Sequence, residues 1–257
     1  MWNRVTEQGF VLWRVKAWEE YSWLVHGFTT RDWGNLALHT GDSQGVIIDN
    51  RKKLSNALGI ELASWVTGSQ VHGTNIQQIS HLERGRGAFS QDSALQDTDG
   101  LITDQTNVLL ASFYADCVPL LFIEPQRKII AMAHAGWRGT LGQIDANMVK
   151  QFHKLYQVEP KEIEVAIGPS IGPCCYQVGQ EVAEKFNEDL VLQKEEGLFL
   201  DLWQANAQQL FKLGVIPEHL FVANICTRCY AQDFFSYRRE QLKAGRMAAL
   251  LYKREGF

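Results

Sequence analysis

The sequence lacks long hydrophobic runs, and neither sign of charge is in large excess. Its first residues, MWNRVTEQGFVLWRVKAWEEYSW, carry a charge every few positions, so we expect neither a secretory signal nor a membrane-spanning helix. Lys and Arg number 25 against 29 Asp and Glu, a net charge of −4. We therefore expect no general attraction to nucleic acid or to anionic membranes, and these features favour a cytoplasmic protein.

Cysteine and proline are also scarce, with five and six copies among 257 residues. No linker rich in Pro or Ser, no repeat and no low-complexity tract interrupts the chain, so we expect a single domain over residues 1–257. In the reducing cytoplasm the cysteines are expected to be buried thiols, metal ligands or reactive groups, not disulfides. A hydrophobic content of 46% is enough to bury a large core.

Short apolar segments rich in strand-forming residues run through the chain. We expect strands at 99–103, 107–115, 119–124, 128–134, 163–168 and 220–227. We expect helices near 50–58, 139–156, 177–188 and 201–214. In the last helix Asp201 is placed to cap the first turn and Gly214 to end the helix. Since helices alternate with tightly connected strands, these patterns predict an α/β (α+β) fold in which helices cover a mixed sheet.

One of these strands, KIIAMAH, ends on His134 and is followed by AGWRGT. A two-residue turn at Pro125-Gln126 would place Cys117 opposite His134 in a β-hairpin, with Cβ atoms about 5 Å apart. A cysteine beside a histidine is half of a zinc site or a Cys-His nucleophile pair. The alternative for Cys117 is a buried small apolar side chain.

A second histidine, His72 in GSQVHGTNI, follows a strand-like segment and stands beside a glycine. Glycine lets the backbone approach another group closely. His72 is therefore a candidate third ligand, with a structural or merely exposed side chain as the alternative.

Seven segments in order resemble the bacterial YfiH-like laccase-domain family: SQVHG, TDGLIT, ADCVPLLF, AHAGWRGT, IGPSIGPCCYQVG, CT at 226–227 and FFSYRR. The resemblance extends over residues 26–254. It implies a four-layer α/β/β/α sandwich with mixed sheets. It also implies a zinc ion held by His72, Cys117 and His134, with copper as an alternative metal. Members are described as multicopper polyphenol oxidoreductases and as purine nucleoside phosphorylases with adenosine deaminase activity.

Three protein ligands leave a fourth position on zinc for substrate or water, as in catalytic sites. The resemblance therefore predicts a small-molecule nucleoside and phosphate as partners. Arginine suits phosphate because its planar fork can bind two oxygens. Arg51, in DNRKKL, is the first candidate, followed by Arg138 and Arg31. Asn35, in TTRDWGN, is a further substrate-binding candidate in a run where Trp33 replaces a glycine common in the family.

The same residues suit two other activities and a binding role. Cys117 with His134 or His72 as base would suit an amidase or deamidase acting on cell-wall precursors. A copper-dependent polyphenol oxidase would need many histidines, whereas the chain has seven and only two lie in the shared motifs. A non-catalytic binding role is the remaining alternative.

Further cysteines lie in GPSIGPCCY and in CTRC. Cys174 and Cys175 are interpreted as packing residues, because adjacent cysteines rarely form a disulfide. CTRC has the spacing of half a structural zinc site, but no second C-x-x-C accompanies it. Ser236, Tyr237 and Arg238, in FFSYRR, are expected near the pocket.

Overall fold

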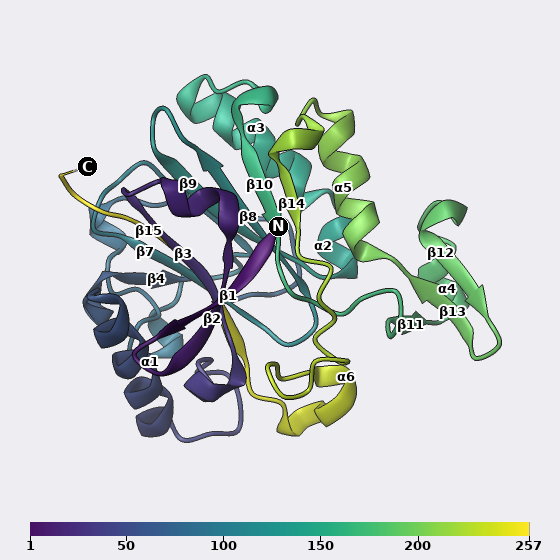
Figure 1. The fold of residues 1–257 in the computed structure, drawn as a ribbon, viewed down its shortest axis with the longest axis horizontal. Coiled ribbons are helices and arrows are strands. Elements are labelled where there is room, and N and C mark those ends of the chain that lie inside the picture. The colour runs from purple at the N-terminus through teal and green to yellow at the C-terminus, as the bar shows by residue number, and fades with distance from the viewer. Residues whose placement is uncertain (257) are drawn as a thin grey trace.

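Two six-stranded sheets form the centre of the molecule (Figure 1). The structure is a computed structural model that describes residues 1–256. The first sheet has the order β1 (Trp2–Glu7), β2 (Phe10–Val15), β3 (Leu24–Thr29), β15 (Met247–Lys253), β7 (Leu109–Tyr114), β4 (Trp65–Thr67). The second has the order β14 (Leu220–Val222), β10 (Glu164–Ile167), β8 (Val118–Glu124), β9 (Ile129–Ala135), β6 (Gly100–Thr103), β5 (Ile76–Gln78). Both sheets combine parallel with antiparallel pairs, as the mixed-sheet prediction requires.

The helices are α1 (Gln44–Leu58), α2 (Trp137–Leu141), α3 (Ile144–Tyr156), α4 (Gln180–Ala183), α5 (Leu202–Lys212) and α6 (Tyr237–Glu240). Short 3-10 helices span Lys16–Glu20, Arg31–Trp33, Leu62–Ser64, His81–Glu83, Gln91–Ser93, Pro160–Glu162, Glu188–Leu190, Pro217–His219 and Gln241–Lys243. Within residues 1–256, no helix combines the length and apolarity needed to cross a membrane.

Three apolar interfaces separate the layers of the fold. Between the sheets, Leu110 and Tyr114 of β7 share one core with Leu121 of β8. Successive residues of a strand face opposite sides, so Leu120 of β8 lies in a core with α3 and α5, and Leu109 of β7 lies in a core with α1. The resulting order of α1, first sheet, second sheet, and α3 with α5 is the α/β/β/α sandwich that the resemblance implies (Figure 1).

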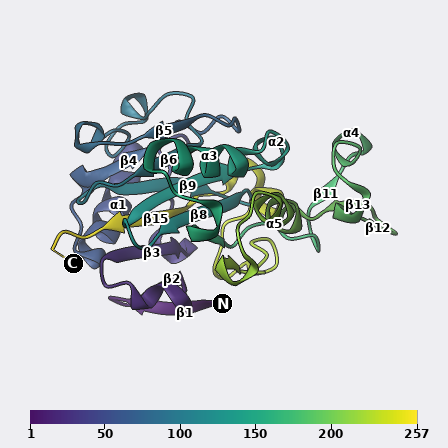
Figure 2. The ribbon, with the colours of Figure 1, turned by 90° about the horizontal axis from the view of Figure 1, so that it is seen from above.

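A small antiparallel sheet projects from this sandwich (Figure 2). It consists of β11 (Gln177–Val178), β13 (Gly197–Leu200) and β12 (Val191–Lys194). The helix predicted over 177–188 is therefore wrong at its start, where Gln177 of β11 pairs with Phe199 of β13. The only α-helix in this segment is α4, which ends at Ala183 and is followed by turns and by the 3-10 helix Glu188–Leu190.

The predicted helix over 139–156 is divided into α2 and α3. A Cβ at Gly142 would lie 2.7 Å from the Thr74 side chain, and Gln143 has a positive φ of 59°. The loop that carries Thr74 thus packs against Gly142, between α2 and α3, where there is no room for a side chain. Helix α5 begins as predicted, since the Asp201 carboxylate accepts a 3.0 Å hydrogen bond from the Gln204 N–H.

The loop between β8 and β9 is longer than predicted. Glu124 pairs with Ile129, so residues 125–128 form a four-residue connection. The Glu124 carboxylate accepts hydrogen bonds from the backbone N–H groups of Gln126 at 3.0 Å and Arg127 at 2.7 Å. These bonds stabilise a wider turn, because Pro-Gln does not suit a two-residue hairpin.

This loop changes the register of the hairpin. Pro119 lies opposite His134, and Cys117 lies just before β8. The predicted pairing of Cys117 with His134 is therefore wrong by two residues. Cys117 still reaches His134, from the segment that leads into the strand.

Candidate active site

Three side chains from separate parts of the chain meet beside the end of β9. His72 comes from the loop between β4 and β5, Cys117 from the entry to β8, and His134 from β9 itself. One ligand atom of each lies within 4.8 Å of the other two. The rings of His72 and His134 have centroids 4.8 Å apart and an interplanar angle of 72°. The structure thus brings together the three residues that the sequence singles out.

Asp99 holds two of these three residues in place. Its carboxylate accepts hydrogen bonds from the backbone N–H groups of Val71, His72 and Gly73 at 3.2, 3.0 and 2.8 Å. Three successive N–H groups around one anion form a nest. The nest holds His72 at φ 61°, a left-handed conformation that non-glycine residues adopt at a cost in energy.

The same carboxylate orients the ring of His134. Oδ1 of Asp99 lies 2.8 Å from Nδ1 of His134, and both side chains are buried. A carboxylate at Nδ1 favours the proton on that nitrogen. Nε2 is then the nitrogen available to a metal ion or to Cys117.

Cys117 and His134 shift each other's protonation. Burial raises the pKa of the Cys117 thiol, but the charge of His134 and hydrogen bonds from His134 and His72 outweigh it and lower that pKa to about 6. Burial lowers the pKa of His134, yet the Cys117 thiolate and Asp99 raise it to about 9. Near neutral pH the sulfur is therefore a thiolate, the form that binds metals and acts as a nucleophile.

The arrangement fits a single tetrahedral metal ion. Zinc binds thiolate sulfur at about 2.3 Å and imidazole nitrogen at about 2.0 Å, which separates neighbouring ligands by roughly 3–4 Å. The three donor atoms lie within 4.8 Å of one another. Gly136 makes this approach possible, because a Cβ there would lie 3.0 Å from Cδ2 of His72 and 3.2 Å from Sγ of Cys117.

The trio opens into a cavity of about 490 Å³, a size suited to a small organic ligand. Four aromatic side chains, two arginines and one histidine line it besides the trio: Phe113, Trp137, Tyr176, Tyr237, Arg238, Arg246 and His39. Burial and the neighbouring arginines lower the pKa of His39 to about 4, so the positive charge comes from the arginines. Aromatic faces can stack on a planar base, and basic groups can bind an anion. Tyr237 and Arg238 are among the residues that the sequence predicts near the pocket.

Asp116 accepts hydrogen bonds from several segments that form the wall of this cavity. Its backbone has φ 90°, and its carboxylate accepts hydrogen bonds from Thr227 Oγ1 at 2.6 Å, Ser236 Oγ at 3.0 Å and the Arg238 N–H at 2.6 Å. Its carbonyl accepts a 2.8 Å bond from the N–H of Ile171. Ser236 is thus buried behind the wall.

Arg138 lies beside the trio, where it lines a smaller hollow together with His72 and Cys117. Its guanidinium carbon lies 4.4 Å from the centroid of the Trp137 ring, and the side chain is exposed. This guanidinium therefore faces solvent at the edge of the site.

Arg51 occupies a different environment. It is fully buried in α1, and its guanidinium donates to the carbonyls of Leu36 at 2.7 Å, Gly87 at 2.6 Å and Ala88 at 2.8 Å. The ring of Phe113, a cavity residue, has its centroid 4.6 Å from the guanidinium carbon. Arg51 does not line the cavity; it supports the wall from behind.

Asn35 also lies behind the wall. Its amide nitrogen donates to Thr40 and, at 2.8 Å, to Asp42, while its carbonyl oxygen accepts from the N–H of Arg246 at 2.9 Å. It therefore positions Arg246 of the cavity. Arg31 does not line the trio's cavity; its guanidinium contacts Glu240 at 3.2 Å.

Several site residues have no role in the sequence-based prediction. Asp99 stands in TDGLIT, where an acidic residue before a Gly and a strand is a detectable signal. Asp116 directly precedes Cys117 and is equally visible. His39 and Arg246 have no local signal, because only the tertiary fold brings them to the cavity.

Known proteins match both the sequence and the fold. Purine nucleoside phosphorylase YlmD of Geobacillus stearothermophilus is 40% identical over 248 residues, which cover 90% of each chain. Adenosine deaminase RL5 of an unknown prokaryotic organism is 32% identical over 228 residues, which cover 86% of this chain and 87% of that protein. The crystal structure of YlmD from Geobacillus stearothermophilus superposes with a TM-score of 0.92 at 37% identity and covers 98% of this chain and 99% of that one.

The Bacillus licheniformis hypothetical protein YfiH superposes with a TM-score of 0.90 at 35% identity, over 95% of this chain and 96% of that one. Residues 26–254 match the family model described as multi-copper polyphenol oxidoreductase laccase. The chain therefore belongs to the multi-copper polyphenol oxidoreductase laccase family.

Proposed function

We propose that this chain is a zinc-dependent cytoplasmic enzyme of purine nucleosides. It would cleave adenosine, inosine and methylthioadenosine with phosphate, and it would also deaminate adenosine with water. The observation that carries the proposal is the meeting of His72, Cys117 and His134 at the edge of a cavity of about 490 Å³ lined by aromatic and basic side chains. Relatives named purine nucleoside phosphorylase and adenosine deaminase support it.

Zinc held by the trio would supply Lewis acidity and lower the pKa of a nearby water molecule. The donor set of one thiolate and two imidazoles suits zinc. Multicopper centres need more histidines, and the metal-capable groups found within residues 1–256 contain only two, His72 and His134. This count favours zinc over copper.

The protein side chains would orient the reactants. In phosphorolysis a phosphate oxygen forms a bond to ribose C1′ while the bond from C1′ to the purine nitrogen breaks, and that nitrogen gains a proton. Tyr176 and Trp137 lie on the cavity wall, where an aromatic face can stack on the base. In deamination, water adds to the amino-bearing carbon of adenine, and ammonia leaves.

Phosphate would be bound at the basic edge of the cavity. Arg138 is exposed beside His72 and Cys117, and Arg246 lines the main cavity. A guanidinium can grip two phosphate oxygens. We assign the main phosphate contact to Arg138, with Arg246 as a second cation.

The test is an assay of the purified untagged protein with adenosine, in the presence and absence of phosphate. We expect adenine and ribose 1-phosphate only with phosphate, and inosine in either case. Cys117→Ala should lose both activities, whereas His81→Ala, which removes an exposed histidine outside the cavity, should keep them. Unchanged turnover in Cys117→Ala would reject the proposed site.

A second candidate function is favoured by one specific observation. Asp99, His134 and Cys117 are arranged as in a nucleophile triad, with the Asp99 carboxylate 2.8 Å from His134 Nδ1. Burial raises the pKa of the Cys117 thiol, but His134 and His72 outweigh this effect and lower the pKa to about 6. Such a thiolate would attack an amide carbonyl and expel the amine, which would take its proton from His134, and water would then hydrolyse the thioester, as in an amidase acting on cell-wall precursors. Chelation should abolish nucleoside cleavage in the zinc enzyme, but it should increase amide hydrolysis if this second function is correct.

A further inference from the structure

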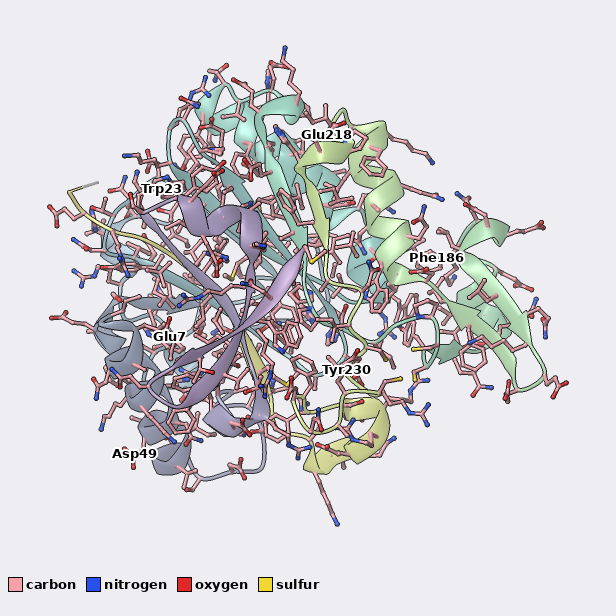
Figure 3. The ribbon with its side chains drawn as sticks, in the orientation of Figure 1. Glu7, Trp23, Asp49, Phe186, Glu218 and Tyr230 are labelled. Atoms are coloured by element: carbon pink, nitrogen blue, oxygen red, sulfur yellow. The ribbon has the colours of Figure 1, made fainter. Side chains whose placement is uncertain are left out.

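The four cysteines outside the trio also meet in space. The sulfur atoms of Cys174, Cys175, Cys226 and Cys229 all lie within 4.8 Å of one another. Sγ of Cys229 lies 3.7 Å from that of Cys174 and 3.4 Å from that of Cys175. Figure 3 shows sulfur atoms in yellow near Tyr230, the residue after Cys229. The adjacent pair Cys174-Cys175 and the C-x-x-C pair Cys226 and Cys229 thus form one cluster, although 51 positions separate Cys175 from Cys226.

We propose that these four cysteines bind a structural zinc ion as a tetrathiolate site, separate from the trio. Four sulfurs at about 2.3 Å from one ion at tetrahedral angles lie about 3.8 Å apart. The two separations of 3.4 and 3.7 Å are close to that value. From the sequence alone, Cys174 and Cys175 are expected to be packing residues and CTRC has no partner; the fold supplies that partner.

A single ion accounts for the geometry better than disulfides do. A disulfide holds its two sulfurs about 2.05 Å apart, whereas Sγ of Cys229 lies 3.7 Å from that of Cys174 and 3.4 Å from that of Cys175. A metal ion uses all four sulfurs at once. A cluster of several irons would place the cysteines on different iron atoms and hold them farther apart, so one tetrahedral ion is the better fit.

The surroundings suit the charge of the site, since four thiolates with one divalent ion carry two net negative charges. The Gly172 N–H donates a 3.3 Å hydrogen bond to Sγ of Cys226. The Arg228 side chain hydrogen-bonds to Cys175. Lys194 Nζ donates at 3.0 Å to the carbonyl of Pro173, beside Cys174. N–H donors and cations around the sulfurs stabilise metal-bound thiolates.

The position of the cluster indicates its role. It joins the loop at 168–176, which carries cavity residues Ile171 and Tyr176, to the turn at 226–230. Thr227 in that turn bonds to Asp116 at 2.6 Å, so the ion would fix two parts of the cavity wall to each other. The site would also anchor the projecting small sheet, which begins at Gln177. The inference does not depend on the proposed nucleoside activity.

The test is zinc analysis of purified protein, with variants that separate the two sites. Cys117→Ala removes the thiolate of the trio, so this variant should contain about one zinc per chain, held by the cluster. Adding Cys229→Ser should remove that ion as well. Cys229 is exposed, so the serine leaves the apolar core intact. No zinc in Cys117→Ala, or equal zinc in both variants, would overturn the proposal.

A second measurement does not require the double variant to fold. Cobalt(II) added to reduced Cys117→Ala should give strong thiolate-to-metal charge-transfer absorption and visible bands of a tetrahedral site. An intact mass lowered by disulfide formation in freshly purified protein, with no cobalt spectrum after reduction, would instead identify a redox pair. Neither measurement depends on enzyme activity. A failure of the nucleoside proposal can therefore be told apart from a failure of the four-cysteine site.

Discussion

The carboxylate of Asp99 lies 2.8 Å from Nδ1 of His134 and also accepts three backbone hydrogen bonds from the loop of His72. The buried Asp99 carboxylate thus fixes the ring orientation of His134 and the backbone conformation of the loop that carries His72. The two candidates come from separate segments, and Asp99 makes their relative position nearly rigid. Metal affinity should therefore depend on a residue that is not itself a ligand.

Asp99→Asn tests this dependence. The amide can accept fewer of the N–H bonds and carries no charge to hold the His134 proton, so we expect zinc affinity and turnover to fall by about 10–100-fold. Zinc affinity is measured by competition with a chelating dye. Asp97→Asn, the same change at an exposed position two residues earlier, should have no effect. Equal affinities in Asp99→Asn and the parent would contradict the role of Asp99.

Gly136→Ala should disturb the trio without removing any of its members. The new Cβ would lie 3.0 Å from the His72 ring and 3.2 Å from Cys117 Sγ, so these groups must move by a few tenths of an ångström. We expect weaker zinc binding and turnover reduced by about tenfold or more. Gly45→Ala in α1, where no atom lies within 4 Å of a new Cβ, is the matched control. A Gly136→Ala enzyme with parental zinc affinity would show that the site tolerates this shift.

Arg51 and Arg138 should respond in opposite ways to substitution. Arg51→Lys loses bonds to backbone carbonyls in a buried site, so we expect the free energy of unfolding to fall by about 2–4 kcal/mol with an unchanged KM for phosphate. Arg138→Ala at its exposed position should alter stability by less than about 0.5 kcal/mol and raise the phosphate KM by about tenfold or more. Denaturant unfolding and phosphate titrations measure both. A raised phosphate KM in a stable Arg51→Lys would restore Arg51 as the phosphate ligand.

Asp145 predicts a pH dependence of stability. It is fully buried, and burial raises the pKa of its carboxyl from 3.8 to about 7. An acid with a raised folded-state pKa destabilises the fold once the unfolded chain ionises, so the cost begins above about pH 4 and is complete above about pH 7.

Asp145→Asn should therefore be more stable than the parent at pH 8, by on the order of 1–4 kcal/mol, and the difference should shrink toward pH 4. Urea unfolding at several pH values measures this. Asp189→Asn at an exposed position is the control. A difference that stays constant from pH 4 to 8 would show that Asp145 ionises normally in the folded chain.

The local sequence pattern predicts four strands of the second sheet, β6, β8, β9 and β10, and one strand of the first sheet, β7. All five are short runs of apolar residues that are buried along their whole length. Strand β15, which lies between β3 and β7, was not predicted. Its sequence, MAALLYK, contains good helix formers, and only its two neighbouring strands hold it extended.

The sequence by itself determined the residue types of the candidate site: a cysteine before an apolar strand, a histidine at the end of another, and a histidine beside a glycine. These signals are local, and local chemistry is what a sequence displays. Only the tertiary structure decided the hairpin register, the burial of Arg51 and the meeting of Cys174 and Cys175 with Cys226 and Cys229. Each depends on contacts between residues far apart in the chain, and such contacts are selected by the packing of the sheets and not by neighbouring residues.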